Sequence, residues 1–452
     1  MRNRIKEGTV LFIGVLKWFV LATAVGSIVG LSTALFLKLL NWSTLQTGRF
    51  EYYYFALVLI FPLSALIIKY LAPAAEGHGT EKVIEAVHKN SGMINLAVVP
   101  VKLLTTVITL AFGGSAGKEG PAAQIGAGLA SFFARLIRLD KNDHKKLVIC
   151  GISAGFAAIF GTPIAGAIFG VEVLFVGSLL YDVLLPSFIA GITSYQVAHA
   201  FGIEYFYHPL TFVPVFKESF FVEVVLAGVF FGIASFIFIE IIQFGKKLSE
   251  KIKAGNILKG IAAGAVLVGL TLVFSRQYLG LGLDTIEAAL EGQALPWYSA
   301  ILKSVYTTIT LNFGGSGGII TPIFYVGTAA GNLFARIAHA DPATFAAMGM
   351  VGLLAGTTNT PIAASIMAME LFGPKIAPYA AVICVISFLM TGHRSVYPSQ
   401  VLSIRKSPHL EAEIGREMED TSTELKLKDK SVAGRIIGFV RKMKEYIKKY
   451  SD

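Results

Sequence analysis

The stretch "KLLTTVITLAFGGSAGKEGPAAQIGAGLASFFARL", residues Lys102 to Leu136, returns in altered form 201 positions later. The second copy is "KSVYTTITLNFGGSGGIITPIFYVGTAAGNLFARI", residues Lys303 to Ile337. Fifteen of the 35 aligned positions are identical, whereas chance would give roughly two or three, so the match marks a repeat. A second pair, "TPIAGAIFGVE" (Thr162 to Glu172) and "TPIAASIMAME" (Thr360 to Glu370), follows in the same order. The chain is therefore an internal duplication.

The composition places this duplication in a membrane. The chain has 452 residues, of which 54% are hydrophobic and 15% charged, whereas soluble domains carry about 25% charged residues. The runs Thr9 to Leu40 and Phe220 to Ile242 each exceed the roughly 20 residues that a spanning helix needs. The first run is too long for a signal peptide and lacks a cleavage-like end, so we expect it to be retained. Cys150 and Cys384 lie in apolar segments, which argues against a disulfide framework.

Glycine and proline interrupt the apolar segments of both repeats, which is typical of transport folds whose inverted repeats contain broken helices. The free N–H groups at a helix N-terminus can bind an anion without any positive side chain. Pro121 and Pro322 suit the first turn of a new helix. The fold class predicted is an all-α polytopic membrane protein with two inverted-topology repeats, about residues 9–200 and 215–402. The alternative, that these glycines serve helix packing alone, does not explain Glu119 between them.

The net charge of +10 could suggest a nucleic-acid partner, but its distribution fits membrane topology better. Loops rich in lysine and arginine normally stay on the cytoplasmic side. We therefore predict an integral membrane protein with both termini cytoplasmic and no nucleic-acid partner. The basic segments are the N-terminus, residues 135–146, residues 245–253 and the C-terminal tail.

The stretch "GGSAGKEGP" also resembles three kinds of enzyme motif. A P-loop fails, because its opening glycine would fall on Phe112 and Glu119 replaces the Ser or Thr. A dinucleotide site fails, because no βαβ pattern surrounds it. The stretches "GGSAG" and "GGSGG" match the nucleophile elbow G-x-S-x-G, so an intramembrane serine hydrolase stays a distant alternative. Its serine would occur twice, without an evident histidine, and we expect no enzyme.

Three short motifs together resemble the CLC family of chloride channels and H⁺/Cl⁻ exchange transporters. They are "GKEGP" (Gly117 to Pro121), "GIITP" (Gly318 to Pro322) and "SVYPS" (Ser395 to Ser399), and the resemblance extends over about residues 9–402. It implies a homodimer in which each subunit has its own anion pathway. It also implies that Glu119 is the gating glutamate, whose carboxylate mimics the permeating anion, and that Tyr397 helps to coordinate that anion. An intramembrane ionisable residue is functional by default, which agrees with this role of Glu119.

The sequence departs from the family pattern at three positions. His78, in "GHGTEKVIE", stands where the family has an anion-coordinating serine, and relatives of the fluoride type also alter that serine. His78 either tunes the anion site by titrating near neutral pH or merely caps a helix. Ile320 replaces a usual phenylalanine. Val173 stands where many proton-coupled members carry a carboxylate, which favours channel-like or uncoupled conduction.

The function predicted is transport of chloride or a similar small monovalent anion, gated by Glu119. The alternative is an H⁺-coupled chloride or fluoride antiporter of the same fold. The partners expected are small monovalent anions, protons under the alternative, and the lipid bilayer. We expect no cofactor, with chloride bound as substrate, and no metal. The predicted anion-binding residues are His78, Gly79, Gly117, Lys118, Gly120, Gly318, Ile319, Ile320 and Tyr397.

Several duplicated charged residues and the tail lie outside these motifs. Glu172 and Glu370 occupy equivalent repeat positions, which suggests a structural role at helix ends or at the dimer interface. Lys102 and Lys303 also occupy equivalent repeat positions. We expect them to have a structural role, in which they pair either with these glutamates or with carbonyl groups. Residues 403–452 predict a cytoplasmic tail, too short for paired CBS nucleotide-sensing domains. Within it, Val432 to Tyr450 predict a basic amphipathic helix that either lies on the membrane or docks on the transmembrane body. The transmembrane anion-transport domain is therefore residues 1–402.

Overall fold

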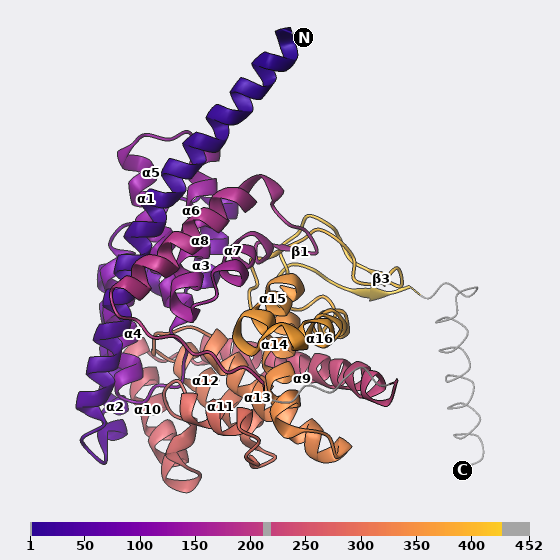
Figure 1. Ribbon diagram of the computed structural model, residues 1–452. Coiled ribbons are helices and arrows are strands. Elements are labelled where there is room, and N and C mark those ends of the chain that lie inside the picture. Colours follow the sequence, from indigo (N-terminus) through magenta and orange to yellow (C-terminus); the bar gives the residue numbers. More distant parts are fainter. Residues whose placement is uncertain (1, 211–217, 427–452) are drawn as a thin grey trace.

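The computed structural model describes residues 2–210 and 218–426, and among these it contains sixteen α-helices, eight from each half of the chain. The halves lie against each other (Figure 1). The first half contains α1 (Arg2–Thr47), α2 (Leu57–Leu71), α3 (Thr80–Lys89), α4 (Val98–Ala111), α5 (Glu119–Leu136), α6 (Lys141–Phe160), α7 (Pro163–Glu172) and α8 (Tyr181–Ala200). The second contains α9 (Glu218–Lys251), α10 (Asn256–Val273), α11 (Leu283–Leu290), α12 (Ser299–Asn312), α13 (Ile320–Ala338), α14 (Pro342–Thr358), α15 (Pro361–Phe372) and α16 (Ala377–Met390).

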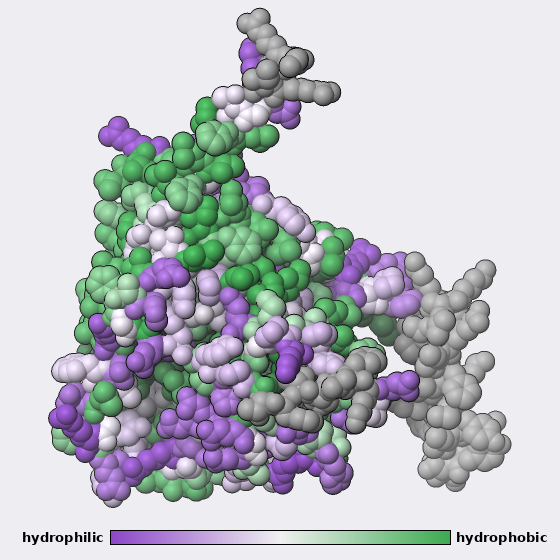
Figure 2. All heavy atoms as spheres, viewed as in Figure 1, coloured by the Kyte–Doolittle hydropathy of each residue, from purple (hydrophilic) through white to green (hydrophobic). Residues whose placement is uncertain are grey.

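Helix length agrees with a membrane fold made of both complete and interrupted helices. In the part of the chain that the structure describes, four segments are long and apolar enough to cross a bilayer: 6–47, 53–71, 218–251 and 256–273. Other apolar helices are shorter, for example α4, α7 and α15. Apolar side chains gather over α1 and its neighbours on the face shown in Figure 2, and hydrophilic residues gather at the opposite end of that face.

Equivalent residues begin equivalent helices in the two halves. The Asp140 carboxylate caps α6 by accepting hydrogen bonds from the N–H groups of Asn142 and Asp143, and Asp341 caps α14 by accepting one from Thr344. Pro163 and Pro361 open α7 and α15, where their missing N–H is not needed. The duplication in the sequence is therefore a duplication of local structure.

The two glycine-rich stretches meet where the halves join. Gly117 and Gly318 form an isolated antiparallel bridge, with N–H···O distances of 2.7 and 2.6 Å. Helices α5 and α13 begin directly after this bridge, at Glu119 and Ile320. The predicted helix starts are confirmed, and an antiparallel bridge between equivalent residues gives the halves a local twofold relationship.

Side chains of each half also satisfy backbone groups of the other. The Ser115 N–H donates to the Thr310 hydroxyl, and the equivalent Ser316 N–H donates to the Thr109 hydroxyl. These atoms are buried, where an unpaired N–H would cost about 1–3 kcal/mol. Neither glycine-rich stretch can satisfy its own backbone without the other half.

Glu172 and Glu370 exchange helix caps between the repeats. The Glu172 carboxylate accepts hydrogen bonds from the N–H groups of Ile362 and Ala363, at the start of α15. The Glu370 carboxylate accepts them from Ile164 and Ala165, at the start of α7. A carboxylate is favourable at a helix N-terminus. Of the two roles suggested by the sequence, the structure shows the one at helix ends.

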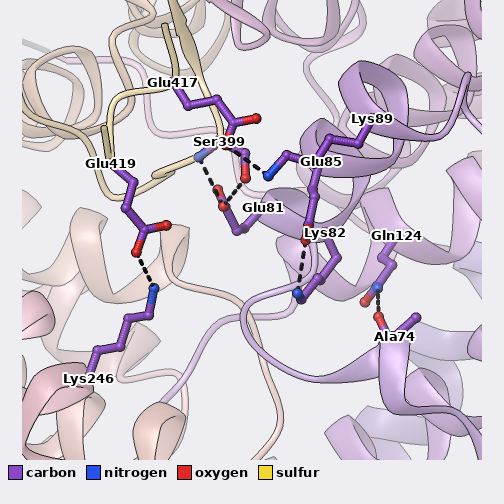
Figure 3. A network of polar contacts seen from close by, with 10 residues as sticks. All are labelled: Ala74, Glu81, Lys82, Glu85, Lys89, Gln124, Lys246, Ser399, Glu417 and Glu419. Atoms are coloured by element: carbon purple, nitrogen blue, oxygen red, sulfur yellow. Dashed lines mark hydrogen bonds and ion pairs between the residues drawn. The ribbon is translucent and has the colours of Figure 1, made fainter. Parts of the chain in front are cut away.

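The segment 401–426 folds back against the helical body. Strand β1 (Phe175–Val176) pairs in parallel with β2 (Val401–Leu402), and β3 (Leu410–Glu411) pairs with β4 (Glu424–Leu425). Ion pairs join Lys89 to Glu417 and Lys246 to Glu419, so the segment is fastened to α3 and α9 (Figure 3). The sequence indicated docking only for a helix after residue 431 and did not predict these short strands. The amphipathic helix expected beyond residue 431 lies outside the described residues.

Candidate anion site

Three helix N-termini lie next to one another at the junction of the repeats. A methyl group placed on Gly120 would lie 2.0 Å from the carbonyl oxygen of His78, so the start of α5 touches the residues just before α3. Gly79 has φ +82° and approaches Gly120 from the other side, a conformation and a distance that favour glycine. With α13 joined through Gly318, three helix dipoles have their positive ends in one region.

Glu119 is held at the start of α13, although it belongs to α5. Its carboxylate accepts a hydrogen bond of 3.1 Å from the N–H of Thr321 and one of 2.5 Å from the Thr321 hydroxyl. The side chain is 1% exposed. A carboxylate bound to backbone N–H at a helix N-terminus occupies the position that a small anion would take.

Three buried donors near Glu119 have no hydrogen-bond partner in the described part of the protein. They are the Nδ1 atom of His78 and the hydroxyl groups of Thr80 and Tyr397. The His78 and Tyr397 rings have centroids 6.2 Å apart, and Tyr397 is fully buried. Buried polar groups are normally paired, so these three neighbouring groups are candidates for binding an anion.

The other predicted site residues have different surroundings. Gly117 and Gly318 donate their N–H groups to each other, so those N–H groups are already used. Ile319 and Ile320 are buried at the start of α13. Lys118 is the residue before α5, and it lines the same cavity of about 100 Å³ as Glu119. The roles of these residues in anion binding stay predictions.

The sequence analysis missed Thr321 and Thr80. Thr321 follows "GII" where the first repeat has Gly120 after Glu119, so the repeat gave no sign that the two halves contribute different groups. Thr80 follows Gly79 at a helix start, where a hydroxyl is common. The only sequence signal for these residues was a threonine close to each motif: Thr80 in "GHGTEKVIE" and Thr321 in "GIITP".

Lys102 and Lys303 support the loops that carry the site. The Lys102 ammonium donates to the carbonyl groups of Ala75 (3.1 Å) and Gly77, just before α3. The Lys303 ammonium donates to those of Tyr278 (3.2 Å) and Gly280 (2.8 Å), just before α11. Both lysines are buried. Of the two pairings left open, the structure shows the one with carbonyl groups.

The hydrolase alternative receives no support from the serine. The Ser115 hydroxyl is buried and lies 3.2 Å from the Thr307 hydroxyl. A nucleophilic serine needs a base within hydrogen-bond reach, and the partner of the Ser115 hydroxyl is another hydroxyl, that of Thr307. The described residues also contain no group of three or more His, Cys, Asp or Glu that could hold a metal ion.

Comparisons with known proteins identify the family to which the chain is similar. Residues 57–392 match the family described as "Voltage gated chloride channel". A "Chloride/fluoride channel protein" of Pseudomonas syringae pv. tomato is 36% identical over 393 residues, which cover 85% of this chain and 86% of that protein. An "H(+)/Cl(-) exchange transporter ClcA" of Klebsiella pneumoniae is 27% identical over 388 residues, which cover 78% of this chain and 80% of that protein. The crystal structure of a CLC-type fluoride/proton antiporter has a TM-score of 0.82 at 27% identity, covering 87% of this chain and 99% of that one.

Proposed function

Because the chain belongs to the voltage gated chloride channel family, the CLC proteins, we propose that it carries fluoride through the site at Glu119 in exchange for protons. Transport of small anions is the activity of the family. The observation that carries the finer proposal is the pair of hydrogen bonds from Thr321 to the Glu119 carboxylate. Glu119 fills an anion position, and protonation would release it.

Fluoride fits the donors of the site. The unpartnered groups of His78, Thr80 and Tyr397 are one imidazole nitrogen and two hydroxyls. Such groups replace water around an anion that accepts strong hydrogen bonds, and fluoride is the strongest acceptor among the halides. The names of the relative from Pseudomonas syringae and of the antiporter of known structure also include fluoride. The sequence alone favoured chloride.

Exchange fits better than passive conduction, although Val173 favoured a channel in the sequence analysis. Val173 is fully buried and cannot bind a proton. A carboxylate that alternates between a bound and a protonated form can itself carry the proton, so no second acid at position 173 is required. Conduction of chloride through a channel is the second candidate, and Val173 is the observation that favours it.

Purified protein in liposomes would separate these candidates. Vesicles are loaded with potassium fluoride or potassium chloride, valinomycin releases the gradient, and external halide and pH are recorded together. We expect fluoride efflux with opposed proton movement, and Glu119→Gln should abolish the proton movement. Glu291→Gln, at an exposed position after α11, is the control. Halide efflux without proton movement in the unmodified protein would favour the channel.

Assembly and orientation are further parts of the proposal. We infer a homodimer with one anion pathway in each subunit, in a prokaryotic plasma membrane with both termini cytoplasmic, and with no cofactor. Subunit mass in detergent and cysteine labelling of the termini in sealed vesicles test these points. A monomer that transports at the same rate would contradict the need for a dimer.

A further inference from the structure

Glu81 joins the first turn of α3 to the segment that carries Tyr397. One carboxylate oxygen of Glu81, Oε1, accepts a hydrogen bond of 3.0 Å from the Ser399 N–H and one of 2.6 Å from the Ser399 hydroxyl (Figure 3). Ser399 stands two residues after Tyr397. Glu81 stands one residue after Thr80, so a single contact connects the elements that supply the unpartnered donors of the anion site.

The opposite side of the Tyr397 segment is fastened to a different part of the protein. The Ser395 hydroxyl accepts from the Tyr397 N–H and donates to Gln400. The side-chain amide of Gln400 donates to the carbonyl groups of Val173 and Thr358. These bonds fix the segment to the ends of α7 and α14. They do not fix its distance from α3, which the Glu81 contact does.

We propose that Glu81 is a positioning residue of the anion site. By holding Ser399, it keeps the Tyr397 hydroxyl at the right distance from Thr80 and His78, and so sets the affinity and selectivity of the site for a small halide. This inference rests on the proposed function. Glu81 touches neither the anion nor Glu119; it acts through Tyr397.

A general helix-start role does not account for this geometry. Helix α11 follows the loop held by Lys303, as α3 follows the loop held by Lys102, so the two helices are counterparts. The first turn of α11 also carries an acid, Asp284, but Asp284 is exposed. An acid in the first turn favours either helix, whereas the two hydrogen bonds to Ser399 are particular to Glu81.

An ion-pair role does not account for it either. The lysines around Glu81 have other partners: Lys82 pairs with Glu85, Lys89 with Glu417, and Lys246 with Glu419 (Figure 3). Within residues 2–210 and 218–426, Glu81 has no ion pair within 4.0 Å, and its second oxygen, Oε2, is buried without a hydrogen-bond partner. The contacts of the Glu81 carboxylate are therefore the two hydrogen bonds that Oε1 accepts from Ser399.

Two substitutions separate the hydrogen bonds from the charge. Glu81→Gln keeps an oxygen that can accept from Ser399 and removes the charge, whereas Glu81→Ala removes both. In halide efflux from liposomes, E81A should weaken the apparent affinity for fluoride roughly tenfold and reduce the preference for fluoride over chloride, since it removes bonds to a carboxylate. E81Q should keep both values close to those of the unmodified protein. Glu85→Gln, one turn later on α3, is the matched control.

Each other outcome overturns a specific claim. If E81A keeps the unmodified affinity and selectivity, Glu81 does not position the site. If E81Q behaves like E81A, the charge matters instead of the hydrogen bonds. Ser399→Ala provides a second route if E81A does not fold: it loses the hydroxyl and keeps the N–H, and should shift affinity roughly threefold. An unmodified protein that moves neither halide would refute the proposed function instead.

Discussion

Gly117 and Gly318 exchange both of their backbone hydrogen bonds across the junction of the repeats. The N–H group of each glycine donates to the carbonyl oxygen of the other, at 2.7 and 2.6 Å. These two bonds hold the N-termini of α5 and α13 next to each other. Neither glycine has room for a side chain: a methyl group on Gly318 would lie 2.7 Å from the Gly120 nitrogen, and one on Gly117 would meet the Glu119 carboxylate. The glycines of the repeat therefore serve close backbone approach, and the helix starts around them remain open to an anion or to Glu119.

Gly120→Ala should damage the site because its methyl group would meet the His78 carbonyl oxygen at 2.0 Å. Overpacking of this kind costs about 1–3 kcal/mol, and here it separates α3 from α5. We expect loss of most halide flux and a lower unfolding midpoint in detergent. Gly269→Ala, in α10 with nothing within 4 Å of the added carbon, should leave flux unchanged. Normal flux in Gly120→Ala would show that α3 need not lie against α5.

Thr321→Val should loosen the hold on Glu119. The change removes the hydroxyl that donates to the carboxylate and keeps the N–H and the side-chain shape. A hydrogen bond to a charged group contributes about 1.5–3 kcal/mol. Without it, Glu119 should take up a proton more readily, so the pH profile of efflux should shift to higher pH. Efflux measured across a pH series checks this.

Two further variants test whether the hydroxyl is responsible. Thr321→Ser keeps the donor and should behave like the unmodified protein. Thr328→Val, further along α13, removes a hydroxyl that donates to the Phe324 carbonyl and should leave the pH profile in place. If Thr321→Val and Thr321→Ser shift the profile equally, hydroxyl donation to Glu119 is not what controls the gate.

Glu172→Ala should destabilise the fold, because it leaves the buried N–H of Ala363 and its neighbour Ile362 without an acceptor. The expected cost is about 2–3 kcal/mol, observed as a lower unfolding midpoint. Glu370→Ala removes the equivalent cap from α7 and should cost a similar amount. The exposed Glu291→Ala is the control, and an unchanged midpoint in both cap variants would mean that water replaces the carboxylates.

Docking of the segment 401–426 should weaken in acid because of His393, which follows the last helix of the body. The ring accepts the Lys406 N–H at Nε2 and contacts the Thr423 hydroxyl at Nδ1. Burial, followed by the charges of Lys406, Arg405 and Arg394, lowers the pKa of His393 below its ordinary 6.5. Undocking removes the burial and the charges of Lys406 and Arg405, so His393 binds a proton more readily in the undocked state. Docking is therefore strongest above pH 6.5 and is lost as the pH falls toward the lowered pKa.

Hydrogen exchange measures this docking directly. Amides of 401–426 should exchange faster at about pH 5.5 than at about pH 7.5, after correction for the intrinsic rates. His393→Gln cannot titrate and should remove the difference between the two pH values. A difference that persists unchanged in His393→Gln would assign the pH response to another group.

The sequence predicted the architecture better than it predicted the contacts. The repeat, the apolar runs and the prolines identify broken helices that begin near residues 119 and 320, because these depend on local composition and on period. The partner of Glu119 is Thr321, and that of Glu81 is Ser399, 318 positions away. No local pattern encodes such pairs. The docked segment after residue 400 was missed because strands of two residues, such as β2, carry no periodicity.

The exchanged caps have a consequence for how the chain is made. When the ribosome has completed α7, the N–H groups of Ile164 and Ala165 still lack Glu370, which is about 200 residues from being synthesised. Ser115 likewise waits for Thr310. The first half therefore enters the lipid with unpaired polar groups, and it reaches its final state only after the second half arrives. Chain synthesis alone therefore delays these pairings until the second half has been made.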